Sequence, residues 1–78
     1  MLHNLKINTV FFEPVLKRIK TFEIRKNDRD FHVGDTINLN EWDNERKEYT
    51  GRSIAIEILY ITDFEQKEGY VVFSFKIV

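Results

Sequence analysis

The chain of 78 residues contains no cysteine, one proline and three glycines. The lack of cysteine excludes a disulfide framework and a thiolate metal site, and it fits a reducing compartment. No apolar run approaches the ~20 residues of a membrane span, and the segment from Met1 to Lys6 has no small-residue cleavage site. These absences predict a cytoplasmic protein with no signal peptide and no membrane partner.

The chain also lacks a strong charge of either sign, because 12 basic residues face 13 acidic ones and the formal net charge is −1. This balance argues against indiscriminate nucleic-acid binding, which usually requires a strongly basic domain. Apolar residues are plentiful, with seven Phe, three Tyr and one Trp. A chain this short buries only about 60 to 65% of its unfolded surface, so we predict a single domain over residues 1–78 with a compact core.

One short helix is predicted after a first strand over Leu2–Ile7. Asn8 or Thr9 is a suitable N-cap. The apolar residues that follow share the helical spacing i, i+3, i+4 and i+7, as expected for a helix that lies on a sheet: Phe12, Val15, Leu16 and Ile19. Pro14 lacks an N–H and is expected in the first turn, so the helix proper is predicted over about 13–18.

Four further strands are predicted at Thr21–Arg25, Thr36–Trp42, Arg52–Ile61 and Tyr70–Ile77, with turn residues between them. Val33-Gly34-Asp35 is predicted to form a tight turn into the strand that begins at Thr36. The segment Arg52–Ile61 is apolar on both faces, so it is expected at the centre of the sheet or in a closed barrel. One helix cannot cover five strands. The sequence therefore predicts a small α+β domain whose mixed sheet curls into a partial β-barrel.

The polar chemistry is densest between Lys17 and Asp30, where six basic residues face three acidic ones. Alternation through the predicted second strand places Phe22 and Ile24 on one face and Glu23 and Arg25 on the other. Side chains two residues apart on a strand lie roughly 6.6 Å apart. Glu23 and Arg25 are thus predicted either to pair directly or to frame a ligand group.

A strand and a short helix precede the motif Lys20-Thr21-x-Glu23-x-Arg25. Further runs follow in order along nearly the whole chain: Lys20–Phe31, Val33–Asp35, Glu41–Asp43, Tyr49–Arg52 and Glu68–Val71. This pattern resembles the ASCH domain, a member of the PUA-like group of small β-barrels, and is most similar to a bacterial and phage subgroup of unknown function. The resemblance implies a PUA-like barrel and RNA binding in a cleft beside the motif strand.

The chain departs from the ASCH pattern at two positions. The family has glycine where this chain has Arg18. A positive φ would strain a non-glycine residue there by about 1 kcal/mol or more, so we expect the helix end to be rebuilt. ASCH amidohydrolases that cleave acylated cytidine carry a Thr nucleophile where this chain has Glu23, and a carboxylate cannot replace an activated alkoxide. The helical insertion that supplies a further acid in those enzymes is also missing.

The main prediction is therefore a domain that binds RNA or a nucleotide-like ligand, with no cofactor and no catalytic residue. The predicted binding residues all belong to the motif segment: Lys20, Thr21, Glu23, Arg25, Lys26 and Arg29. Arginine suits bidentate contact with a phosphate or a base edge, and lysine suits a point-charge phosphate contact. Glu23 is predicted either to accept a hydrogen bond from an exocyclic amine or to orient Arg25.

Two other functions remain open, an amidohydrolase acting on a modified nucleoside and a protein-interaction adaptor. The alternative for the motif residues is a set of salt bridges on an exposed strand face, worth about 0 to 1 kcal/mol. Asn27 and Asp28 are predicted to form a turn. Trp42 has outward parity, and we expect a bulge to rotate it into the core or the residue to cover an end of the barrel. The alternative is a stacking platform for a base. His3 and His32 lack partners at metal spacing, so no metal site is predicted.

Overall fold

The computed structural model describes residues 1–78, and its strands form one mixed sheet in the order β1-β3-β4-β5-β2. The elements in chain order are β1 (Leu2–Asn8), α1 (Thr9–Leu16), β2 (Phe22–Lys26), β3 (Thr36–Asp43), β4 (Glu48–Thr62) and β5 (Tyr70–Ile77). β1 is parallel to β3, and the other neighbouring strands are antiparallel. The predicted α+β class, five strands and single helix are confirmed.

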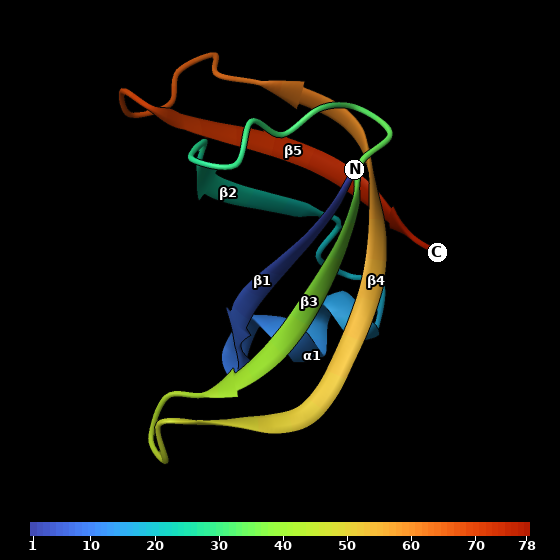
Figure 1. Cartoon of the computed structure of the whole chain (residues 1–78), viewed down its shortest axis with the longest axis vertical. Helices are drawn as coiled ribbons and strands as arrows, with labels where there is room; N and C mark the ends of the chain where they lie inside the picture. Colours follow the sequence, from blue (N-terminus) through green and yellow to red (C-terminus); the bar gives the residue numbers. More distant parts are fainter.

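The sheet curls into a half-barrel because β4 is long enough to serve two groups of strands. Its first part pairs with β3, and its last part pairs with β5 after a bend that is clear in Figure 1. The prediction that this strand is central is therefore confirmed. The curl brings the two outer strands, β1 and β2, toward each other. Arg25 Nη2 donates to Lys6 O at 2.8 Å and Arg29 Nη1 donates to Asn4 O at 3.0 Å, so side chains rather than a backbone ladder join these edges.

The core fills the concave side of the half-barrel. There, the inward-pointing residues, which alternate with outward-pointing ones along a strand, pack against α1. Its twelve members come from every element except β2 and from the loop before β3: Leu5, Ile7, Phe12, Val15, Phe31, Ile37, Leu39, Ile56, Ile58, Val71, Phe73 and Phe75. A register shift in β4 between Ile58 and Tyr60 changes the alternation, so Ile61 packs against the core while Tyr60 is exposed.

The helix begins earlier than predicted. Asn8 caps it by accepting a hydrogen bond from the Val10 N–H at 3.0 Å, which confirms one of the two predicted caps. Because β1 runs directly into the helix, Pro14 lies inside α1 rather than in the first turn, and the predicted span 13–18 is wrong. The apolar stripe is correct for Phe12 and Val15 only, since Ile19 lies beyond the helix and is exposed.

The other strand boundaries shift by a few residues, apart from β5, which matches its predicted range. β4 begins at Glu48 instead of Arg52, because polar residues of the predicted loop pair with β3. Gly34 has φ +92° in the tight turn before β3, as the Val33-Gly34-Asp35 segment predicted. Asn27 Oδ1 accepts from the Phe31 N–H at 3.0 Å, which confirms the predicted turn role of Asn27.

Arg18 ends the helix in a left-handed conformation, with φ +63°. The Ile19 N–H donates to Pro14 O at 2.9 Å and the Arg18 N–H donates to Val15 O at 3.0 Å. This pair of bonds is the Schellman motif, in which glycine is the favoured residue at the left-handed position. The expected rebuilding of the helix end is therefore wrong: the two hydrogen bonds hold the exposed Arg18 in a strained conformation.

Replacing Arg18 with glycine is expected to raise the free energy of unfolding by about 0.5 to 1 kcal/mol. Relief of left-handed strain, worth roughly 1 to 2 kcal/mol, is partly offset by the greater freedom of glycine in the unfolded chain. Urea denaturation of Arg18→Gly, beside Arg18→Ala as the control that keeps a Cβ, measures this effect. Equal stability of the two variants would contradict the strain.

Candidate functional site

A pocket of about 420 Å³ lies between the end of β1, the start of α1 and β2, where the two outer strands of the half-barrel face each other without pairing. We call it the β1–β2 pocket. Its lining comes from these three regions and the turn before β2: Lys6, Ile7, Asn8, Phe11, Lys20, Phe22, Glu23, Ile24 and Arg25. The pocket is therefore built beside the strand that carries the Lys-Thr-x-Glu-x-Arg motif.

The structure brings Lys20, Glu23 and Arg25 together in this pocket. Glu23 is buried, and its two carboxylate oxygens accept hydrogen bonds from different cations. Lys20 Nζ donates to one oxygen, and Arg25 Nε donates to the other at 2.8 Å. Glu23 and Arg25 pair directly, which was one of the two predicted arrangements. Because both oxygens of Glu23 are engaged, the geometry favours its orienting role over contact with an exocyclic amine.

Lys20 lies at the aromatic side of the pocket. Its ammonium is 4.9 Å from the ring centre of Phe22 and 5.7 Å from that of Phe11, and both rings are about half exposed. Lys20 Nζ also donates to Phe22 O at 2.7 Å. A cation held beside two accessible aromatic faces offers an anion contact and an apolar surface for a flat ring.

The remaining predicted site residues lie outside the β1–β2 pocket. Thr21 is exposed, and its C=O accepts from the Phe75 N–H at 3.0 Å in the β2–β5 ladder. Lys26 is exposed at the end of β2. Arg29 joins the two outer strands by its bond to Asn4 O, and its nearest approach to Asp28 is 4.0 Å. Lys20, Glu23 and Arg25 thus form one group, and Thr21, Lys26 and Arg29 do not join it.

Sequence reasoning missed the β1 and α1 side of the pocket, which includes Lys6, Asn8 and Phe11. Phe11 lies one residue before the buried Phe12 and off the apolar stripe of the helix. An aromatic residue at such an exposed position was the available sign that this surface belongs to a site. Nothing in the sequence of β1 indicates that it faces β2. That contact arises from the curl of the sheet.

Trp42 keeps its outward parity and is half-buried, while the preceding Glu41 is buried. The expectation that a bulge rotates Trp42 into the core is therefore wrong, although the β3–β4 register does shift between Asn40 and Trp42. Lys6 Nζ lies 3.9 Å from the indole centre and the Tyr49 ring packs edge-on at 5.0 Å. These neighbours cover much of the Trp42 side chain on the outer face of the sheet.

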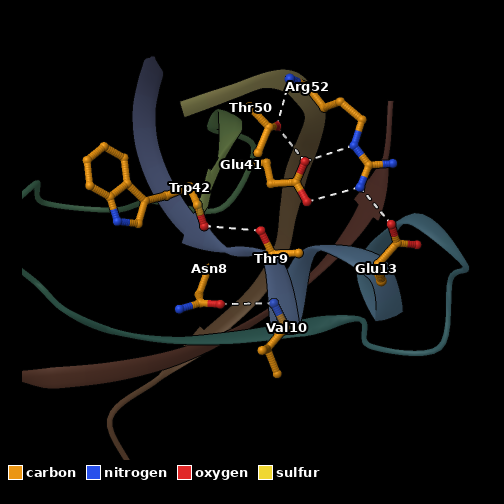
Figure 2. A network of polar contacts seen from close by, with 8 residues as sticks. All are labelled: Asn8, Thr9, Val10, Glu13, Glu41, Trp42, Thr50 and Arg52. Carbon is orange, nitrogen blue, oxygen red and sulfur yellow. Dashed lines mark hydrogen bonds and ion pairs between the residues drawn. The ribbon is translucent and has the colours of Figure 1, made fainter. Parts of the chain in front are cut away.

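A second polar group fixes α1 to the sheet. Figure 2 shows the Arg52 guanidinium of β4 pointing toward Glu41 of β3 and Glu13 of α1. Arg52 Nε and Nη2 donate to the two Glu41 oxygens at 2.8 and 3.0 Å, Nη2 also donates to Glu13 Oε1 at 2.6 Å, and Thr50 Oγ1 donates to Glu41 at 2.5 Å. Gly51, with φ +94°, lets Thr50 and Arg52 reach the same carboxylate.

These bonds shift the titration of the group. The hydrogen bonds from Arg52, together with that from Thr50, lower the pKa of Glu41 to about 2 despite its burial. The pKa of Arg52 is raised above its ordinary value by its hydrogen bonds to Glu41 and Glu13. Each Glu41 oxygen has a donor, and Arg52 joins Glu41 of β3 to Glu13 of α1, so the group clamps the helix to the sheet.

Asp35 forms a similar anchor at the start of β3. His3 Nε2 lies 2.8 Å from Asp35 Oδ2, the Met1 amino group donates to Oδ1 at 3.0 Å, and the His32 N–H donates to Oδ2 at 3.0 Å. The hydrogen bond from His3 is the main reason that the pKa of Asp35 falls to about 2. The structure contains no group of three or more His, Asp or Glu side chains that could hold a metal ion.

The fold and site define a small half-barrel with a cationic, partly aromatic pocket between its outer strands. The model of the family described as "Domain of unknown function (DUF3850)" matches residues 2–75, so the chain belongs to that family. The chain is also 37% identical over 71 residues to the "Uncharacterized 12.9 kDa protein in GpA 3'region" of Escherichia phage P2. That match covers 90% of this chain and 63% of the phage protein, so the chain spans less than two thirds of its relative's length.

Neither of these matches carries the ASCH name, so the ASCH and PUA-like resemblance stays a prediction. The phage relative agrees with the predicted bacterial or phage setting of the subgroup. α1 spans eight residues, and no helix is long and apolar enough to cross a membrane.

Proposed function

We propose that this chain is a binding domain for RNA or a nucleotide-like ligand, and that the ligand occupies the β1–β2 pocket. The observation that carries the proposal is the coincidence of the pocket with the motif residues Lys20, Glu23 and Arg25. The pocket volume of about 420 Å³ lies within the usual range for small-ligand sites, roughly 300 to 1,000 Å³. Its accessible Phe faces suit a base.

The charge of the pocket supports an anionic ligand. The Lys6 ammonium lies over Trp42, but Lys20 and Arg25 line the pocket with a single carboxylate, Glu23, so the lining has a formal excess of positive charge. Glu23 holds Lys20 and Arg25 in place before any ligand arrives, which lowers the ordering cost of binding. In this proposal Lys20 contacts a phosphate as a point charge, and Arg25 shapes the wall of the pocket through its bond to Lys6 O.

The small number of cations around the pocket predicts weak, shape-dependent binding. Single-stranded nucleic acid gives a salt slope near −0.7 per neutralised phosphate, so a few contacts correspond to a slope of about −2 to −3. The prediction that Lys26 and Arg29 contact phosphate at the rim belongs to the same proposal. An RNA longer than one nucleotide would extend past the hydrogen bond between Arg25 and Lys6 O toward Lys26 and Arg29.

Lys20→Gln is expected to weaken binding of a short single-stranded RNA or a nucleoside monophosphate about 10-fold at low salt, since a charge-assisted hydrogen bond is worth roughly 1.5 to 3 kcal/mol. The matched control is Lys47→Gln in the β3–β4 turn, which makes the same charge change at an exposed residue bonded to Asn44. Titration by calorimetry, with NMR shift mapping on the native chain, measures both variants.

Three results would contradict the proposal: no shift change with any RNA or nucleotide, shifts that cluster away from Lys20, Glu23 and Arg25, or equal loss of binding in the two variants. Incubation of the protein with acylated cytidine tests the amidohydrolase alternative separately. Release of free cytidine would favour the amidohydrolase over a binding domain. Capture of one defined protein, with no RNA signal, would favour the adaptor.

A further inference from the structure

The β1–β2 pocket is bounded by two strand edges whose backbone groups have no ladder partner. β2 pairs with β5 alone, and successive residues of a strand point their N–H and C=O groups to alternate sides. Thr21 O accepts from the Phe75 N–H at 3.0 Å, and the Asn27 N–H donates to Gly69 O at 2.8 Å. The backbone N–H and C=O groups of the odd-numbered residues of β2 therefore point toward β5. Those of Phe22 and Ile24 point the other way, toward the pocket.

Ile24 is the residue whose donor and acceptor both remain available there. Phe22 O already accepts from Lys20 Nζ at 2.7 Å. The N–H and the C=O of Ile24 have no partner on β5, and no side chain bonds to either group. Ile24 lines the pocket, so an adjacent donor and acceptor open into a space that also holds the Lys20 ammonium and the Phe22 ring.

The opposite wall limits what can occupy this edge. The Thr36 N–H donates to Met1 O at 3.0 Å, so the backbone N–H and C=O groups of the odd-numbered residues of β1 point toward β3. Those of Lys6 point away from β3, toward the gap between β1 and β2. Arg25 Nη2 spans the gap to Lys6 O at 2.8 Å, and Arg29 spans it again at Asn4 O. An added peptide strand needs a continuous free edge. These arginine bridges close the slot beyond Ile24, so the edge accommodates a compact group and not a strand.

From this geometry we infer that the β1–β2 pocket binds a nucleobase or a similar flat heterocycle through the backbone of Ile24. The inference rests on the proposed function and specifies which part of the ligand the pocket reads. The Ile24 N–H donates to a ring nitrogen or carbonyl oxygen of the heterocycle, and the Ile24 C=O accepts from a neighbouring N–H. Such adjacent donor and acceptor groups are found on the pairing edges that proteins read in single-stranded RNA.

The two remaining contacts follow from the same arrangement. The faces of Phe11 and Phe22 provide apolar surface on which the ring can stack. Lys20, which lies close to both rings, is positioned for the phosphate of the same nucleotide. Because the reading groups belong to the backbone, changes in the side chain at position 24 leave the donor and the acceptor in place.

Ile24→Pro tests the inference, because it removes the N–H that faces the pocket without removing a bond to β5. Ile24→Ala is the matched control, since it shortens the same side chain and keeps the N–H. With cytidine 5′-monophosphate as the probe, we expect Ile24→Pro to bind at least about 10-fold more weakly than wild type and Ile24→Ala to stay within about threefold. Equal affinities of the two variants would overturn the inference.

A second measurement on the native chain applies even where Ile24→Pro fails to fold. Saturation with cytidine 5′-monophosphate is expected to move the Ile24 amide proton downfield and slow its exchange with solvent, whereas ribose 5-phosphate leaves the Ile24 amide exchange unchanged. Binding of both compounds at Lys20 without any effect on the Ile24 amide would overturn base reading and leave the proposed function standing. Absence of binding by either compound would remove both.

Discussion

Replacing Arg52 with methionine is expected to lower the free energy of unfolding by about 3 kcal/mol. The change leaves the Glu41 carboxylate, which is only 1% exposed, without its bidentate partner and with Thr50 as its remaining donor. Removing one member of a buried ion pair typically costs 3 to 5 kcal/mol. The lower end applies because the Arg52 side chain is half exposed, and water can reach part of the vacated space.

Urea denaturation of Arg52→Met, with Arg46→Met as the control, measures this effect. Arg46 is exposed at the β3–β4 turn, and its Nε lies 3.8 Å from Asp43 Oδ2. Its loss is expected to change stability by no more than about 0.5 kcal/mol. Glu41→Gln combined with Arg52→Met is expected to lose less stability than the sum of the single changes, because no buried charge remains. A loss below about 1 kcal/mol for Arg52→Met would show that the clamp is not needed.

Acid is expected to unfold the domain through the two clamped carboxylates. The pKa of Asp35 is lowered from 3.8 to about 2, and that of Glu41 from 4.5 to about 2. A group with a lowered pKa in the folded state stabilises the fold above its unfolded pKa and loses that contribution as pH falls through its folded pKa. Stability from these two groups is therefore constant above about pH 5 and declines toward pH 2.

The expected loss over this range is about 2 kcal/mol for Asp35 and about 3 kcal/mol for Glu41. Urea denaturation at pH 7, 5, 3.5 and 2.5 measures the decline. Asp35→Asn and Glu41→Gln each remove one titrating group, so each variant is expected to show a shallower decline below pH 5 than the native chain, whatever its stability at pH 7. Parallel curves for the native chain and both variants would contradict the roles of these carboxylates.

The regular elements could be predicted from local pattern. Alternation of apolar residues marked all five strands, Asn8 marked the helix start, and Gly34 marked the turn before β3 because a left-handed residue is needed there. The helix boundaries were missed because β1 runs directly into α1, which places Pro14 inside the helix. The helix end was missed for another reason: two backbone hydrogen bonds hold Arg18 in a conformation that its residue type disfavours.

The candidate site divides in the same way. The proximity of Lys20, Glu23 and Arg25 could be predicted because the three residues are close in sequence. Glu23 and Arg25 are two apart on one face of a strand, and Lys20 lies three residues before Glu23 in the preceding turn. The exposure of Phe11 could be anticipated from its place off the apolar stripe of the helix, but no local pattern relates Phe11 or Lys6 to the motif strand. Their contribution depends on how strongly the sheet curls, which is a property of all five strands together.

By itself, the amino-acid order determined the number and type of elements, the inward residues of β3 and β5, and the charged cluster beside Phe22. Only the tertiary structure decided that β1 faces β2, that Arg25 and Arg29 bridge them, and that Arg52 clamps Glu41 to Glu13. These partners lie 11 to 39 residues apart along the chain. Such contacts follow from the curvature of the assembled sheet, because no local period relates residues at those separations.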